Sequence, residues 1–173
     1  MGDSVSMVFT IILAVIVMFL FPLMDTWERQ DDLSYMAVYT ATVDFVDAVR
    51  NTGVLTKSMY ESYLSQIGGT ANTYDVTLEH REYLVVPSGD STEVIYLNHY
   101  FSEIEDKLYD ATERYSYPFT KGDYFYVSVK NTNKTQATMM EQTAFGTRVE
   151  TFKIGVPYGG QIKTTYHVPV ETE

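Results

Sequence analysis

Residues Met7 to Met24 read MVFTIILAVIVMFLFPLM, an apolar run that is interrupted only by Thr10 and Pro22. As an α-helix rising about 1.5 Å per residue, this run would be about 27 Å long, close to the roughly 30 Å hydrocarbon core of a bilayer. We therefore interpret residues 7–24 as a membrane segment.

Three kinds of segment are apolar near an amino terminus: a cleaved secretory signal, a permanent membrane anchor, and a helix that leaves the membrane to enter the core of a filament. A cleaved signal has a basic amino-terminal region and a small-x-small cleavage site. Residues 1–6 contain no Lys or Arg, and residues 20–25 are all large. We favour the two membrane-helix interpretations. Pro22 does not decide between them, because membrane helices tolerate proline, but it predicts a kink or local loosening.

The helix is expected to continue beyond the membrane segment, because residues 27–50 contain no Gly, Pro or turn cluster. Apolar residues there recur every three or four positions, which is typical of an amphipathic helix lying on a globular domain. We expect one helix on the order of 70 Å long from about residue 4 to 51, with Gly53 as its C-cap. The expected core-facing stripe consists of Leu33, Met36, Ala37, Thr40, Val43 and Val46 or Asp47.

The chain therefore divides into two parts. Residues 1–53 form the long helix, with a membrane anchor at 7–24 and an amphipathic continuation at 25–51. Residues 54–173 are enough for one globular domain of ordinary size. Acidic residues dominate the carboxyl flank of the anchor (Asp25, Glu28, Arg29, Asp31, Asp32), which fits poorly on the cytoplasmic side. We predict a single-pass cell-membrane protein with its carboxyl-terminal domain outside.

Charge and cysteine content narrow the function classes. The net charge of -11 is spread over the globular part, which argues against binding to nucleic acid or anionic lipid, since both need clustered Lys and Arg. The chain has no cysteine. This excludes disulfides, thiolate metal sites and a cysteine nucleophile, so the core of an exported domain must hold it together.

The globular domain is predicted to combine short helices with an antiparallel sheet, which makes the fold class α+β. A second helix follows Gly53, with Leu55, Met59, Tyr63 and Ile67 on one face. Its predicted signals are Thr56 or Ser58 as N-cap, a Ser58–Glu61 capping box and Gly68-Gly69 as terminator. A third helix is expected over 102–115, opened by a Ser102–Glu105 capping box and ended by Tyr117-Pro118.

Strands are expected where β-favouring residues alternate. Residues 74–86 and 94–97 should form a hairpin around the turn at 87–90, and 123–130 should form a strand that turns out at 131–133. Residues 147–156 and 161–168 are predicted as a second hairpin across Pro157-Tyr158-Gly159-Gly160. Residues 135–145 are ambiguous between a short helix and irregular structure.

Histidine and carboxylate side chains are the candidates for chemistry. His80 has Glu79 and Glu82 nearby in the sequence, and His99 precedes a helix bearing Glu103 and Glu105, so a zinc site is conceivable. No pair has metal-ligand spacing, and His167 stands alone. Ordinary surface or half-buried histidines are the better interpretation. No nucleophile, phosphate-loop or nucleotide motif is present, so we expect neither an enzyme nor a cofactor or metal site.

Tyrosine is abundant, with 15 residues. Clusters occur at Tyr60 and Tyr63, at Tyr109, Tyr115 and Tyr117, and at Tyr124 and Tyr126. An apolar body with a polar tip suits protein interfaces, and ordinary use in the sheet and core is an equal alternative. Asn133-Lys134-Thr135 is a glycosylation sequon on a predicted turn, which weakly supports surface exposure.

Taken together, the chain resembles type IV pilin-like proteins, and more narrowly the small pilin-like subunits of tight-adherence (Tad) pili. The resemblance covers most of the chain as an architecture. It rests on the apolar segment with Pro22, its unbroken continuation to Arg50, the FVDAVRNTG junction at 45–53 followed by LTKSMYE at 55–61, and the late Tyr158-Gly159-Gly160.

The resemblance implies a structural subunit, major or accessory, of a surface filament. Its partners would be copies of itself, other pilin-like subunits, the membrane before assembly and the assembly machinery. Pilins carry an early glutamate that neutralises a neighbour's amino terminus; the only early acid here is Asp3, the candidate for an intersubunit charge. The filament-core residues would be Val8, Phe9, Ile11, Ile12, Val15, Ile16, Phe19, Leu20 and Pro22.

Two alternatives remain open. The first is a bitopic surface protein whose outer domain binds a partner and never polymerises. The second, which ranks well below it, is an exported hydrolase that uses His80 or His99.

Overall fold

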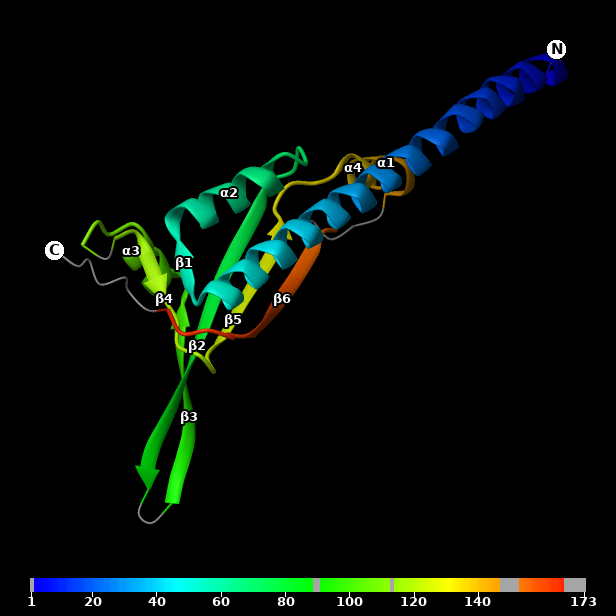
Figure 1. Cartoon of the computed structure of the whole chain (residues 1–173). Helices are drawn as coiled ribbons and strands as arrows, with labels where there is room; N and C mark the ends of the chain where they lie inside the picture. The colour runs from blue at the N-terminus through cyan, green and yellow to red at the C-terminus, as the bar shows by residue number, and fades with distance from the viewer. Residues whose placement is uncertain (1, 89–90, 113, 147–152, 167–173) are drawn as a thin grey trace.

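A single long helix runs from the amino terminus onto a small α+β head, as Figure 1 shows. The computed structural model describes residues 2–88, 91–112, 114–146 and 153–166. The predicted fold class, a long amino-terminal helix followed by short helices and antiparallel sheet, is confirmed. The elements are α1 (Gly2–Thr52), β1 (Val54–Thr56), α2 (Lys57–Gly68), β2 (Tyr74–Ser88), β3 (Ser91–Tyr100), α3 (Phe101–Leu108), β4 (Ser116–Pro118), β5 (Tyr124–Asn131), α4 (Gln136–Phe145) and β6 (Gly155–Gln161).

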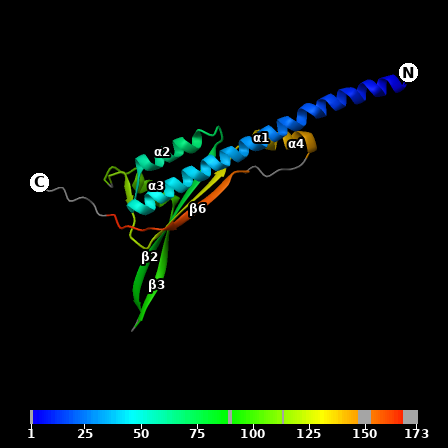
Figure 2. The ribbon, with the colours of Figure 1, turned by 45° about the vertical axis from the view of Figure 1, so that its right-hand side comes forward.

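Helix α1 is 51 residues long and passes through Pro22 without a break. The Thr26 hydroxyl donates a 2.8 Å hydrogen bond to the Pro22 carbonyl. At the carboxyl end, Gly53 has φ 72° and donates its N–H to the Val49 carbonyl at 2.8 Å, so the predicted glycine stop is confirmed. The amino-terminal half projects free of the head, and the other half lies along it (Figures 1 and 2).

The face that α1 turns towards the head differs from the predicted one. Of the expected stripe only Val46 is buried, while Leu33 is 70% and Met36 59% exposed. The expected stripe was therefore wrong. The actual face includes three polar residues, Asp31, Ser34 and Thr42. The Thr42 hydroxyl is satisfied by the Val38 carbonyl and the Tyr63 hydroxyl. The buried residues are Asp31, Ser34, Val38, Ala41, Thr42, Phe45, Val46 and Val49.

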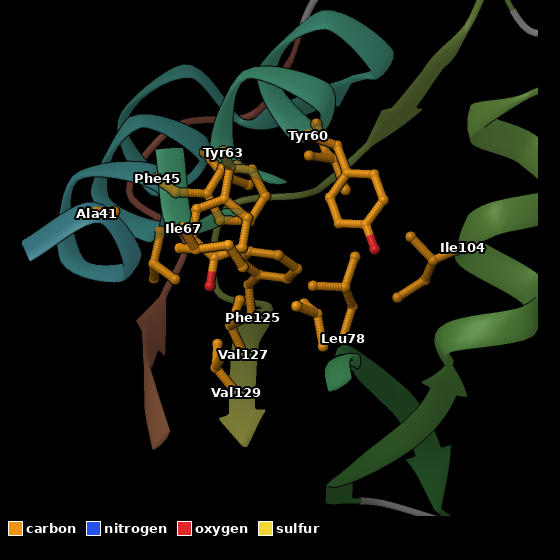
Figure 3. Close-up of a cluster of buried hydrophobic side chains, with 14 of the residues drawn as sticks. Ala41, Phe45, Tyr60, Tyr63, Ile67, Leu78, Ile104, Phe125, Val127 and Val129 are labelled. Carbon is orange, nitrogen blue, oxygen red and sulfur yellow. The ribbon is translucent and has the colours of Figure 1, made fainter. Parts of the chain in front are cut away.

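The main sheet has four antiparallel strands in the order β3-β2-β5-β6. One face alternates into the core, with Phe125, Val127 and Val129 of β5 buried. Helices α1 and α2 cover this face, and the Phe45 ring of α1 stacks on Tyr63 of α2 at 4.4 Å between centroids (Figure 3). A second, two-stranded sheet pairs β1 with β4 and was not predicted.

The hairpin of β2 and β3 extends well beyond the head (Figures 1 and 2). It was predicted as strands 74–86 and 94–97, and both strands are longer. Pairing of β2 with β5 stops at Arg81↔Tyr124, whereas pairing with β3 continues to Ser88↔Ser91. We call the two-stranded part, residues 82–88 and 91–97, the arm.

The local signals of the helices were partly misassigned. Thr56, one of the two N-cap candidates of α2, accepts the Met59 N–H at 3.3 Å, so the alternative Ser58 and its capping box with Glu61 were wrong. Helix α3 begins after Tyr100 with no side-chain cap, so the Ser102–Glu105 box was wrong as well. It stops at Leu108, not 115, because residues 116–118 pair with β1 instead.

The predicted hairpin at 157–160 is also wrong. Residues 155–161 form one continuous strand, β6, paired with β5 along its length. Its glycines allow close approach instead of a turn: a Cβ on Gly159 would lie 2.3 Å from the Tyr126 ring, and one on Gly160 would lie 2.7 Å from the Arg50 guanidinium. Residues 147–152 and 167–168 of the two predicted strands lie outside the described residues. The ambiguous segment is helix α4, capped by Thr135 and by Gly146 in the left-handed conformation.

Candidate functional site

The amino-terminal part of α1, residues 4–24, is the most unusual surface of the chain, and we call it the stalk. Within the described residues, one helix is long and apolar enough to cross a membrane, with a mean hydropathy of 2.8 in its best window and none of that window buried. These properties are consistent with a membrane anchor or with a signal sequence.

The predicted packing residues all lie on this stalk. Seven of them are exposed, Leu20 is partly buried, and Pro22 is exposed within the helix. The opposite side is apolar too, since Leu13, Met18 and Phe21 are exposed. A helix that is apolar all round belongs in a membrane or in a packed core. The Asp3 side chain lies outside the part of the chain that the structure describes. The seven exposed residues are Val8, Phe9, Ile11, Ile12, Val15, Ile16 and Phe19.

Two exposed apolar residues lie on the head-bearing half of α1, separated from the stalk by the exposed charged residues Asp25, Glu28, Arg29 and Asp32. Leu33 and Met36 form this outer stripe, on the side of α1 that faces away from the sheet. Tyr35 and Tyr39 lie beside it, stacked with their ring centroids 6.3 Å apart. Sequence periodicity identified Leu33 and Met36 but assigned them to the core. The outer stripe is an exposed apolar part of α1.

The direction of the stalk is fixed by a polar contact between α1 and α4. Asp31, only 8% exposed, accepts a 2.7 Å hydrogen bond from the Thr135 hydroxyl at the start of α4. The Lys153 ammonium lies 3.8 Å from the Asp31 carboxylate and 3.5 Å from that of Glu141. A buried carboxylate needs such partners. The sequence showed no sign of this contact, because residue 31 meets a segment more than a hundred residues later.

The His80 side chain is buried, and both of its ring nitrogens have hydrogen-bond partners. Its Nδ1 lies 2.9 Å from the Tyr117 hydroxyl and its Nε2 3.1 Å from the Asp123 carboxylate. The same carboxylate accepts the backbone N–H groups of Thr120 at 2.8 Å and Tyr83 at 2.9 Å. Burial lowers the pKa of His80 despite the Asp123 partner. Sequence proximity to Glu79 and Glu82 was misleading here, because the partners are Tyr117 of β4 and Asp123, the residue before β5.

His99 stacks on His80, with ring centroids 5.2 Å apart. Its Nδ1 lies 2.7 Å from Glu103 and its Nε2 3.1 Å from Glu82. Burial opposes protonation, but the hydrogen bonds to these two carboxylates raise the pKa of His99. Glu79 pairs with Arg81 instead, and Glu105 stays on the exposed face of α3.

The two histidines link the segments that meet at the base of the arm through hydrogen bonds. Each ring nitrogen faces a carboxylate or a phenol, and the contacts join β2, β3, α3, β4 and the residue before β5. Among the described residues, no group of three or more His, Cys, Asp or Glu side chains could hold a metal ion. His167, the remaining histidine, lies outside the described residues.

The tyrosines divide between the core and the surface. Tyr60 and Tyr63 are core residues, and burial raises the pKa of each to about 12. Tyr109 and Tyr115 are exposed beside the Lys57 ammonium. A further row crosses the uncovered face of the sheet, with successive ring centroids 6.0, 6.1 and 6.2 Å apart; it consists of Tyr83, Tyr96, Tyr124 and Tyr126.

Two side chains of the sequon, Asn133 and Thr135, make hydrogen bonds within the head. The Asn133 amide accepts the Thr73 N–H at 2.9 Å and donates to Asn72 at 2.9 Å, and Thr135 is buried against Asp31. The expected surface exposure therefore holds for Lys134, while Asn133 is half-buried.

No protein-family model, curated protein or solved structure matches the chain. Function must therefore be inferred from the geometry of α1 and the head.

Proposed function

We propose that the chain is a pilin-like structural subunit, major or accessory, of a type IV or Tad-like surface filament. In this proposal the stalk holds the subunit in the cell membrane before assembly, with the head outside. During assembly the stalk packs against copies of itself and other pilin-like subunits.

The observation that carries the proposal is the continuity of α1. One helix of 51 residues combines a bare apolar stalk with a half that is packed on the sheet through Phe45, Val46 and Val49. A membrane anchor alone needs no rigid link to its domain. Here the Asp31–Thr135 contact and the core hold the stalk in one direction relative to the head. A rigid link of this kind suits a subunit whose helix and head must both meet defined neighbours.

The outer stripe supports the same proposal. Leu33 and Met36 place a second exposed apolar surface on α1 at the level of the head, beyond the charged residues 25–32. Exposed apolar surface of this kind is typical of a contact with another protein. Lipid is as apolar as the stalk, so the transfer from membrane to filament must gain its free energy from tight packing and from assembly machinery, and not from the hydrophobic effect alone.

Gentle shearing of the source cells tests the proposal. Released high-mass material and the remaining membranes are separated and blotted for the chain. A filament subunit is expected in the released material. Finding it only in the membranes would contradict a role as the major subunit and favour an accessory subunit or a bitopic protein whose outer domain binds a partner.

A matched pair of variants sharpens this experiment. Met36→Glu charges the outer stripe, and Tyr109→Glu charges an exposed aromatic residue of the head that lies away from α1. Both variants should reach the membrane at normal levels, since neither side chain is in the core. Met36→Glu should be depleted from the sheared fraction because α1 packing would bury its charge. Equal release of both variants would argue against packing through this stripe.

A further inference from the structure

The outer face of the main sheet carries a groove. Helices α1 and α2 pack on the opposite face (Figure 3). The groove has a volume of about 380 Å³, within the roughly 300–1,000 Å³ of small-molecule sites. The sheet register places Ser128 of β5 at its floor, between Thr77 of β2 and Pro157 of β6. Because these three side chains are short, their row lies lower than the row beside it.

A wall of larger side chains borders this floor. Glu79 and Tyr126 form the next outward-facing pair of the register, and Arg81 and Tyr124 form the pair after that, towards the arm. The Arg81 guanidinium lies 5.1 Å from the centre of the Tyr126 ring, and the Tyr124 ring stacks on Tyr126 with centroids 6.2 Å apart. Both neighbours lie on the arm side of Tyr126, so the other side of its ring faces the groove.

The polar groups at the groove combine donors with acceptors. The Arg81 Nε donates a 2.9 Å hydrogen bond to one carboxylate oxygen of Glu79. Among the residues that the structure describes, neither the terminal nitrogens of Arg81 nor the other oxygen of Glu79 has a hydrogen-bond partner. The Thr77 and Ser128 hydroxyls can both donate and accept. The groove therefore offers hydrogen-bonding groups without net charge beside an aromatic ring.

A sugar ring matches both parts of this surface. One face of a pyranose presents C–H groups, which are attracted to the electron-rich face of an aromatic ring. The hydroxyl groups around its edge both donate and accept hydrogen bonds, as the side chains of Arg81, Glu79 and Ser128 require. The ring and the polar groups lie on the same groove, so one sugar can contact both.

Other classes of ligand fit this surface less well. Among the described residues that line the groove, none is Leu, Ile, Met or Phe, which argues against an acyl chain. The net charge of -11 disfavours nucleic acids and acidic glycans, which are polyanions. A protein partner would need roughly 800 Å² of surface with an apolar centre, and the centre here is polar.

We propose that this groove binds a neutral glycan, with one sugar ring stacked on Tyr126 and its hydroxyl groups bonded to Arg81 and Glu79. The tyrosine row continues the aromatic surface from the groove towards the arm, with ring centroids 6.2, 6.1 and 6.0 Å apart. Further sugars of the same chain would lie along this row. The site uses no residue of α1, so it goes beyond the filament role and does not rest on it.

Binding to immobilised polysaccharides tests the proposal, with the full chain in detergent micelles and biolayer interferometry as the readout. The detergent must have no sugar head group, because a maltoside would compete for the groove. Dextran, mannan, galactan and xylan are the neutral probes, and dextran sulfate and alginate are the acidic ones. At least one neutral probe should bind with a Kd at least about tenfold lower than that of either acidic probe.

Three variants locate the binding. Ser128→Ile fills the floor with a residue that strands favour, so the fold should persist and the affinity should fall at least about tenfold. Tyr126→Ala removes the stacking ring and should weaken binding by about tenfold as well. Tyr109→Ala is the matched control, because it removes an exposed tyrosine that does not line the groove, and it should leave the affinity unchanged.

Three results would each overturn the proposal. The first is failure of every neutral probe to bind, which would favour a protein partner. The second is tighter binding of an acidic probe, and the third is an affinity that neither Ser128→Ile nor Tyr126→Ala lowers. The sheared-filament assay is a separate readout, so failure of either proposal leaves the other standing.

Discussion

Thr135 at the start of α4 donates a 2.7 Å hydrogen bond to the buried carboxylate of Asp31 in α1. Its Oγ1 also accepts the Thr138 N–H as the helix cap. Thr135→Ala removes both bonds and should lower the free energy of unfolding by about 1–3 kcal/mol. Urea unfolding of the full chain in detergent measures this. Thr143→Ala in the same helix, whose hydroxyl is exposed, should change it by less than about 0.5 kcal/mol; equal losses would contradict the role of the cap.

Phe45 rather than Leu33 should carry the stability of the α1–head contact. The Phe45 ring stacks on Tyr63 at an interplanar angle of 4°, while Leu33 points into solvent. Phe45→Ala should cost about 3–5 kcal/mol in thermal or urea unfolding. Leu33→Ala should be near neutral. The reverse order would restore the stripe that sequence periodicity suggested.

Gly159→Ala should destabilise the head by about 1–3 kcal/mol, since overpacking forces neighbours to move. Its added methyl group would also lie 2.6 Å from the Phe125 carbonyl oxygen, which is backbone and cannot rotate away. Gly68→Ala in α2 is the matched control, because nothing lies within 4 Å of its Cβ position. It should be neutral or stabilising by up to about 1 kcal/mol. Melting temperatures that fall equally for both would rule out the close-approach explanation.

His99 should stabilise the fold more at low pH than at high pH. Its pKa is raised above the model-compound value of 6.5, so the stabilisation is complete below about pH 6.5 and is lost as the pH rises through the folded-state pKa. Glu82 and Glu103 face the ring, and His80 stacks on it. The stability difference between wild type and His99→Gln should therefore be larger at about pH 5.5 than at about pH 8.5.

The contribution of His80 to stability depends on pH in the opposite direction. The useful quantity is therefore the difference in stability between wild type and His99→Gln at each pH. Its pKa is lowered by burial, and its contribution is present above about pH 6.5 and lost as the pH falls through the folded-state pKa. A difference for His99→Gln that grows with pH would show that the paired carboxylates do not favour the charged ring.

Val15→Asp should abolish stable membrane insertion of the chain. A carboxylate at the centre of a spanning helix costs about 2.5–3.5 kcal/mol on insertion scales, and Val15 lies near the middle of the stalk. Carbonate extraction of membranes measures the loss, with Val15→Leu as the control. Normal levels of membrane-resistant Val15→Asp protein would count against the stalk as a membrane segment.

Local signals predicted the helices well where the deciding residues are close in sequence. The length of α1, its stop at Gly53 and the cap of α2 at Thr56 follow from neighbouring residues. The end of α3 does not. Lys57 donates its N–H to the Tyr115 carbonyl, and residues 116–118 pair with β1, so a contact from far along the chain overrides a helical pattern.

The buried face of α1 and the histidine partners could not be predicted for the same reason. Periodicity identifies apolar stripes, but α1 has one through Leu33 and Met36 and another through Val38 and Phe45. Only the second packs against the head. His80 meets Asp123 only because β2 and β5 pair with His80 opposite Phe125. Gly159 and Gly160 were predicted as a turn because glycine is typical of turns. Glycine is also required where neighbouring atoms leave no room for a Cβ, and the sequence does not distinguish the two cases.

The unbroken course of α1 through Pro22 has a mechanical consequence. A pull on the head is transmitted along one helix directly into the stalk, with no loop between them to absorb it. Proline has no N–H for the carbonyl four residues earlier, so the turn from Met18 to Pro22 holds one hydrogen bond fewer than its neighbours. Under tension, this turn should lengthen first, which makes the helix a stiff rod with one compliant point inside its apolar part.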